Sequence, residues 1–178
     1  ISRVDIYLTI DDNAAANGDL AQAVFCGLRC RNQLSPIGYS TNKLDIVINK
    51  FNVDLTMTAN TSLYATIVEF SSTIILKARS FGMTNSEISA DLSLPLIRGA
   101  SDNSVIYFRG AVLSNLNIVD ELVFSQNAFT LNLAAPLSSF FPGDRVAQFF
   151  VFEAFSTTQS IAFIGNSAHI DTLTIRGT

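Results

Sequence analysis

The sequence predicts an all-β protein: a single domain spanning residues 1–178, folded as an antiparallel β-sandwich with at most one or two short helices. Three observations lead there. Most segments alternate apolar and polar residues with period two, the pattern of half-buried strands. Gly, Pro, Asn, Asp and Ser cluster between these segments, as turns require. The 178 residues suit one domain with its own core.

The predicted strands follow one another at short spacing, which favours a sandwich or barrel over βαβ units. The first is Val4 to Ile10, where Val4, Ile6, Leu8 and Ile10 share one face. The full set is 4–10, 44–48, 51–57, 63–70, 73–78, 105–108, 112–118, 129–133, 145–155, 161–164 and 169–175. No internal repeat and no linker-like segment stands out, so one domain is expected.

Two segments break the period-two pattern. Asp19 to Gln22 resembles a helical capping box, with Leu20, Val24 and Leu28 near one helical face. A short helix and a strand are equally good interpretations there. Thr84 to Glu87 has the same cap pattern and predicts at most one or two helical turns.

The segment FFPGDRVAQFFVFEAF, residues 140–155, is apolar on both faces of its predicted strand. An antiparallel surface strand should be apolar on one face only. A second face therefore needs cover, from an intramolecular loop or from another subunit. We expect a subunit interface formed by Phe149 and Val151, or else by Phe150 and Phe152; the candidate interface residues are Phe149, Phe150, Val151, Phe152 and Phe155.

The same region carries a family resemblance. Gly143, Asp144, Arg145 and Val146, followed by an aromatic strand and a closing run from Asp171 to Ile175, resemble the last strands of complement-type and tumour-necrosis-factor-type globular heads. Single jelly-roll virion proteins look the same at this level. The resemblance implies a jelly roll packed around a symmetry axis, typically a trimer, with the aromatic strand facing that axis.

Composition restricts the possible partners. The net charge is −4 and the 11 basic residues are scattered, whereas binding to phosphate backbones needs clustered Lys and Arg. Direct nucleic-acid binding is therefore not expected. No apolar run is long enough to span a bilayer, and no signal peptide is recognisable. Charged residues make up only 15%, which suits packing against neighbouring subunits.

Catalytic, metal and cofactor sites are not predicted. The single histidine, His169, lies two residues before Asp171, but no nucleophile motif accompanies the pair. Cys26 and Cys30 supply two of the usual four metal ligands, and we interpret them as half-buried thiols. The acidic segment from Asp11 to Asp19 fits no calcium-loop spacing and is expected to be a solvated loop.

The functional prediction is a structural virion protein without enzymatic activity: a capsid, vertex or spike component that assembles through apolar strand faces. Its expected partners are copies of itself, as a trimer or pentamer, other structural proteins, and a host receptor. The first alternative is a secreted or cell-surface trimeric head for receptor binding or adhesion. The second is a small hydrolase or cupin-like enzyme, which the single histidine disfavours.

Overall fold

The fold is known from a computed structural model, which describes residues 3–11, 22–32, 45–59, 62–94, 105–137, 144–153, 156–157, 160–171 and 174–176. The described residues are nearly all in strands and include no helix, and thus none long and apolar enough to cross a membrane. The strands are β1 Val4–Asp11, β2 Gln22–Asn32, β3 Asp45–Asn49, β4 Phe51–Thr58, β5 Ser62–Thr84, β6 Glu87–Ser93, β7 Val105–Ser125, β8 Ala128–Leu137, β9 Asp144–Glu153, β10 Ser156–Thr157, β11 Ser160–Ile164, β12 Ser167–Asp171 and β13 Thr174–Arg176.

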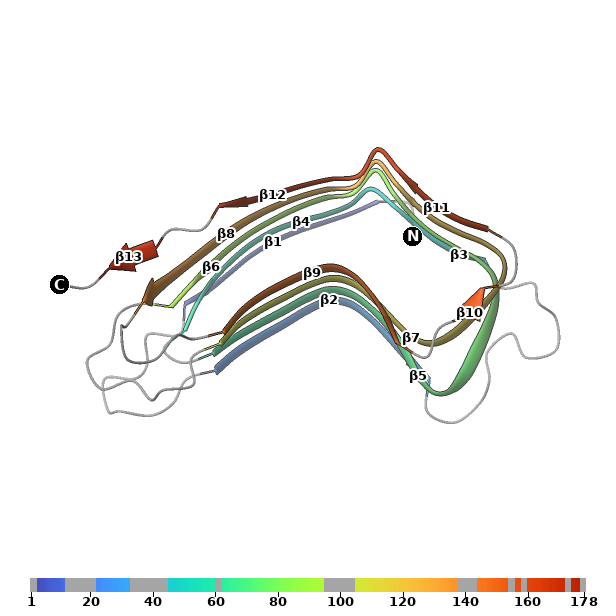
Figure 1. Cartoon of the computed structure of the whole chain (residues 1–178), viewed down its shortest axis with the longest axis horizontal. Coiled ribbons are helices and arrows are strands. Elements are labelled where there is room, and N and C mark those ends of the chain that lie inside the picture. Colours follow the sequence, from blue (N-terminus) through green and yellow to red (C-terminus); the bar gives the residue numbers. More distant parts are fainter. Residues whose placement is uncertain are drawn as a thin grey trace.

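The strands pair in parallel, which makes the predicted antiparallel jelly-roll sandwich wrong. The first sheet has the order β1-β4-β6-β8-β12, and the second is built on β2, β5, β7 and β9 with β3, β10 and β11 alongside. All of their pairings are parallel. Register shifts occur in the pair formed by β5 and β7. The chain therefore winds as a solenoid, and each coil hydrogen-bonds to the next (Figure 1).

Each coil passes once through both layers of the molecule. In Figure 1 the first sheet is the upper layer, and the second sheet forms an arch below it before turning back on the right. The coils differ in length: Val4 pairs with Phe51, 47 residues on, whereas Val53 pairs with Ile88, 35 residues on. The expectation of no internal repeat was thus wrong in structural terms, because coils of unequal length hide the repeat.

The two sheets meet at a sharp corner that recurs in every coil. One residue with positive φ stands there each time, namely Lys50, Asn85, Gln126 and Gly165. The backbone N–H of Asn85 donates to the Ser125 carbonyl at 2.9 Å, and that of Gln126 to the Ile164 carbonyl at 2.8 Å. The predicted helical turn at Thr84 to Glu87 is this corner, because Asn85 adopts the left-handed conformation that ends β5.

The residues that follow Asn85, Gln126 and Gly165 form what we call the corner ladder: Ser86, Asn127 and Asn166. Ser86 Oγ accepts from the Phe51 N–H at 3.1 Å, and Asn127 Oδ1 accepts from the Ser86 N–H at 3.2 Å. Asn166 Oδ1 accepts from the Asn127 N–H at 3.1 Å. Each side chain thus satisfies a backbone donor of the preceding coil, where an unpaired group would be costly.

The side-chain amide groups of the ladder also donate to neighbouring coils. Asn127 Nδ2 donates to the Met83 carbonyl at 2.9 Å and to Asn166 Oδ1 at 2.9 Å. Asn166 Nδ2 donates to the Phe124 carbonyl at 2.9 Å. Ser86 and Asn127 are fully buried, so their part of the ladder lies inside the core, whereas Asn166 is half-buried on the last coil.

The second sheet bends halfway along its strands, and the bend changes which residues face inward. In β7, Phe108 and Gly110 face the core before the bend, and Ala111 and Leu113 face it after the bend, whereas Val112 is buried outside the core cluster. Two consecutive residues therefore face the core at this point. Gly110 has no room for a side chain, since an added Cβ would lie 2.4 Å from the Phe149 carbonyl oxygen.

We predict that Gly110→Ala destabilises the fold by about 2–3 kcal/mol, the usual cost of overpacking a close contact. The clash is with backbone, which cannot move without displacing β9. Gly82→Ala in β5 is the matched control, because no atom lies within 4 Å of a Cβ added at Gly82. Urea unfolding should lower the midpoint for Gly110→Ala only; equal midpoints for the two variants would contradict the bend.

Most predicted strands exist, although their boundaries differ. The predicted strands 63–70 and 73–78 are parts of one strand, β5, and 105–108 and 112–118 are parts of β7. The segment Glu87–Ser93 was missed and forms β6. Where a helix and a strand were equally good interpretations, the described part, from Gln22 on, is strand β2.

Candidate functional site

The two end coils are the part of the surface where apolar side chains are exposed. Nine large hydrophobic residues of the described chain are exposed, and all lie on the first or the last coil: Tyr7, Leu8, Val24, Val47, Phe152, Ile161, Phe163, Ile164 and Ile170. Among the side chains of the middle coils, β4 to β7, whose burial the structure describes, no large hydrophobic residue is exposed. Contiguous apolar exposure marks interaction surfaces in folded proteins.

Several of these residues end stacked columns of core side chains. Phe163 is 48% exposed, whereas Phe124, its partner one coil below, is fully buried. Their rings stack with centroids 5.3 Å apart. Ile161 is 53% exposed above Leu122, which is also fully buried. The core columns thus continue to the end coil, and no described strand lies beyond it.

The aromatic strand that drew attention in the sequence is β9, in the last coil. Phe149 packs against Phe108 and Phe129, with ring centroids 6.2 and 5.1 Å away. Phe150 packs against Phe124 at 4.5 Å, and Phe152 against the same ring at 6.1 Å. Both faces of the sequence pattern are apolar because the bend places Phe149 and Phe150 on the same inner side.

The candidate interface residues therefore divide. Phe149, Phe150 and Phe152 contact the intramolecular core, with Phe152 39% exposed. Val151 is half-buried and pairs with Val112. Phe155 lies outside the described residues. Whether another subunit covers this strand stays a prediction.

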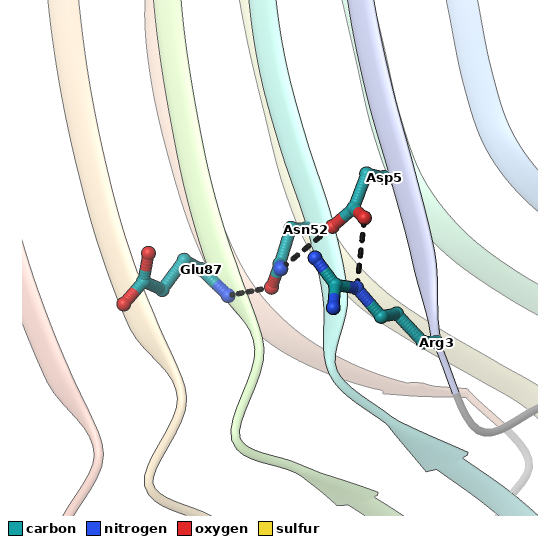
Figure 2. Close-up of polar contacts among 4 residues, drawn as sticks. All are labelled: Arg3, Asp5, Asn52 and Glu87. Atoms are coloured by element: carbon teal, nitrogen blue, oxygen red, sulfur yellow. Dashed lines mark hydrogen bonds and ion pairs between the residues drawn. The ribbon is translucent and has the colours of Figure 1, made fainter.

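The outer face of the first sheet is polar and partly acidic. A shallow groove there is lined by Tyr7, Asn52, Asp54, Glu87, Ser89 and Thr130. Figure 2 shows the contacts that cross its strands: Arg3 Nε donates to Asp5 at 2.9 Å, Asn52 Nδ2 donates to Asp5 at 2.9 Å, and the Glu87 N–H donates to Asn52 at 3.2 Å. These bonds join β1, β4 and β6.

Two exposed carboxylates secure the first coil to the second. The hydrogen bond from Asn52, then that from Arg3, lowers the pKa of Asp5 below its ordinary value. Asp45 accepts from Arg79 and from Ser80, the latter at 2.6 Å, and these bonds lower its pKa in the same sense. Both groups therefore stay ionised at neutral and mildly acidic pH, where they connect β1 to β4 and β3 to β5.

The outer face of the second sheet carries a small aromatic and cationic cluster. Tyr64 stacks on Tyr107 with ring centroids 6.3 Å apart, and the Arg109 guanidinium lies 4.8 Å from the Tyr107 ring centroid. Together with Thr66 they line a second shallow groove. Arg109 Nε and the neighbouring Gln148 Oε1 are buried without a hydrogen-bond partner.

The residues weighed for catalysis or metal binding do not form a centre. His169 Nε2 lies 3.2 Å from Asp171 Oδ2, as their spacing on one face predicted, but both side chains are about 70% exposed on the last coil. Cys26 and Cys30 are half-buried thiols, as predicted, and Cys26 Sγ donates to the Leu28 carbonyl at 3.9 Å. The described residues contain no group of three or more His, Cys, Asp and Glu placed to hold a metal. Of the acidic segment 11–19, only Asp11, at the end of β1, is described.

Comparison with models of protein families, with curated proteins and with solved structures finds no match to this chain. The parallel coils also remove the basis of the resemblance to jelly-roll heads, because Asp144 to Val146 begin a strand that pairs in parallel with β7. The sequence interpretation missed the corner ladder and the open end coils. The recurring pairs Asn85-Ser86, Gln126-Asn127 and Gly165-Asn166 were the available signal for the ladder.

Proposed function

We propose that this chain is a structural module that assembles through its end coils, as a component of a virion spike, vertex or capsid. The observation that carries the proposal is the confinement of the nine exposed large hydrophobic residues to the first and last coils. A solenoid buries its core by stacking, so uncovered end coils favour contact with further β-coils. The described side chains of the middle coils include no exposed large hydrophobic residue.

The partner that fits these ends is a second copy of the chain. At one end of the first sheet stands β12, whose inward Ile170 is 44% exposed above the buried Leu131. At the other end stands β1, whose Leu8 is 37% exposed beside the buried Leu55. Because all strands of the sheet run in one direction, β12 of one copy can continue in parallel onto β1 of the next.

This arrangement differs from the trimer or pentamer expected from the sequence. That expectation came from the jelly-roll resemblance, which implied a symmetry axis along the aromatic strand. Contact between unlike ends is heterologous and produces an open row of copies. Strand edges left without partners are in any case prone to pair with other chains.

Receptor binding is the second candidate function. The observation in its favour is the cluster of Tyr64, Tyr107 and Arg109 on the outer face of the second sheet. Stacked tyrosines with an adjacent guanidinium suit recognition of a partner with a polar and an apolar part.

Sedimentation velocity over a range of protein concentrations tests the assembly. We expect species larger than the monomer that persist at about 1 M sodium chloride, where the Debye length is about 3 Å and exposed ion pairs are screened. Apolar contacts are not weakened by that screening. The assembly should also persist in mild acid, since protonating carboxylates of this acidic chain reduces repulsion between copies.

Two substitutions test where one copy contacts the next. Leu8→Asp on β1 and Ile170→Asp on β12 each put a charge on an end strand of the first sheet and should shift the protein to monomer. Thr130→Asp puts the same charge on the exposed outer face of β8 and should leave the distribution unchanged. A wild-type monomer at all concentrations, or dissociation by salt alone, would overturn the proposal.

A further inference from the structure

The last coil ends in a step, because the two sheets have unequal numbers of layers. The first sheet stacks five strands, β1, β4, β6, β8 and β12. Along its arch the second sheet stacks four, β2, β5, β7 and β9. Strand β12 therefore lies one layer beyond β9 along the stacking direction. If a second copy stacks on β12, a gap as wide as one strand remains between β9 and that copy.

The floor of this step is apolar and has the backbone edge of a strand. Phe149, Phe150 and Phe152 line it along β9, and Phe163 lies beside them with ring centroids 5.3 Å from Phe150 and 6.3 Å from Phe152. Phe152 is 39% exposed, whereas Leu113, the residue below it in the same column, is fully buried. One more strand would bury Phe152 as β9 buries Leu113.

We propose that this step binds an extended segment of another polypeptide, which adds to β9 as a parallel strand. Strand addition to a sheet edge takes its affinity from main-chain hydrogen bonds and its specificity from the alternating side chains. The inference rests on the open end coil of the proposed function, but it does not require copies of this chain to stack.

The bend of the second sheet determines the pattern of the added segment. In β7, the positions that face the core cluster are Ile106, Phe108, Gly110, Ala111 and Leu113, whereas Val112 is buried outside that cluster, so two inward positions are consecutive. The segment must follow the same path, with apolar residues at alternating positions on each side of an adjacent inward pair. A regular amphipathic strand would turn a polar face to the core beyond the bend.

The charge beside the step adds a preference. Glu153 is exposed on β9 and pairs with Ser114 on β7. A residue of the added strand directly opposite Glu153 lies within reach of its carboxylate, and opposite charges in that arrangement are favourable. The segment should therefore carry Lys or Arg three positions after the second residue of its inward pair.

A synthetic peptide with the sequence of residues 105–114, VIYFRGAVLS, is the probe, because this segment already lies against β9 from the other side. A version with Lys in place of its last Ser adds the charge. We expect the labelled peptide to bind the full chain, the Lys version to bind more tightly, and β9 amides to gain protection from hydrogen exchange. A control peptide with Asp at the Phe108 and Leu113 positions should bind at least tenfold more weakly.

The outcomes separate this inference from the proposed assembly. Equal binding of the control peptide, or binding that leaves the β9 amides unprotected, overturns the strand addition. Protection of β9 by self-assembly alone, with no displacement by peptide, also overturns it, because a second copy then covers the step. Sedimentation of the peptide-free protein reports on the assembly independently of these results.

Discussion

Asn127→Ala should destabilise the protein by about 2–5 kcal/mol. The substitution removes the acceptor of the Ser86 N–H and the donor to the Met83 carbonyl. Each buried polar group left unpaired costs about 1–3 kcal/mol. Asn127 is fully buried, so water cannot replace the lost bonds without entering the core. Urea unfolding followed by circular dichroism measures the loss.

Asn132→Ala is the matched control for this experiment, because Asn132 lies five residues further along β8 and is exposed. Its removal should change stability by less than about 0.5 kcal/mol, as for most surface substitutions. Similar midpoints for Asn127→Ala and the wild type would mean that the corner ladder does not hold successive coils together.

Phe149→Asp should destabilise the last coil by about 3 kcal/mol or more, the range for losing a buried aromatic ring. The ring of Phe149 contacts those of Phe108 and Phe129, both almost fully buried. A carboxylate among these rings would have no ion-pair partner, which adds to the cost. Thermal unfolding and protease resistance of the last coil report the effect.

Val151→Asp is the comparison, because Val151 is half-buried outside the core cluster on the same strand and should tolerate the charge at a cost of about 1 kcal/mol. The sequence alone predicted a different result for Phe149→Asp: dispersal of an assembly with the β structure retained. If that result is observed, Phe149 belongs to a subunit interface, and the packing of β9 onto the core contributes little.

The sequence was sufficient to predict strands because each keeps its core face through period-two alternation. It could not reveal their direction, since parallel and antiparallel strands with one buried face show the same pattern. The double apolar character of 145–155 has a structural cause that the sequence interpretation did not consider. A bend that makes two consecutive residues face inward produces the same pattern of apolar residues as a strand that is covered on both faces.

The sequence interpretation did not predict the solenoid, for a related reason. Coils of 35 to 47 residues bring Val53 opposite Ile88 and Val4 opposite Phe51, so no constant period exists to be found. The corner residues Ser86 and Asn127 gave only short, common dipeptides such as Asn-Ser and Gln-Asn. Their role depends on burial and on the coil below, which local sequence does not encode.

Cross-linking of designed cysteines tests the central claim, that copies join through their end coils, most directly. One column of paired residues across the first sheet consists of Tyr7, Asp54, Ser89, Thr130 and His169. If β12 continues onto β1 of the next copy in this register, a cysteine at 169 lies about 4.8 Å from one at 7, within disulfide reach.

The measurement uses Tyr7→Cys with His169→Cys in a chain whose Cys26 and Cys30 are replaced by Ser, oxidised and separated without reductant. The account predicts a ladder of covalent dimers, trimers and longer species from the double variant, and monomer from each single variant. Absence of cross-linked species from the double variant, or dimers from His169→Cys alone, would contradict it.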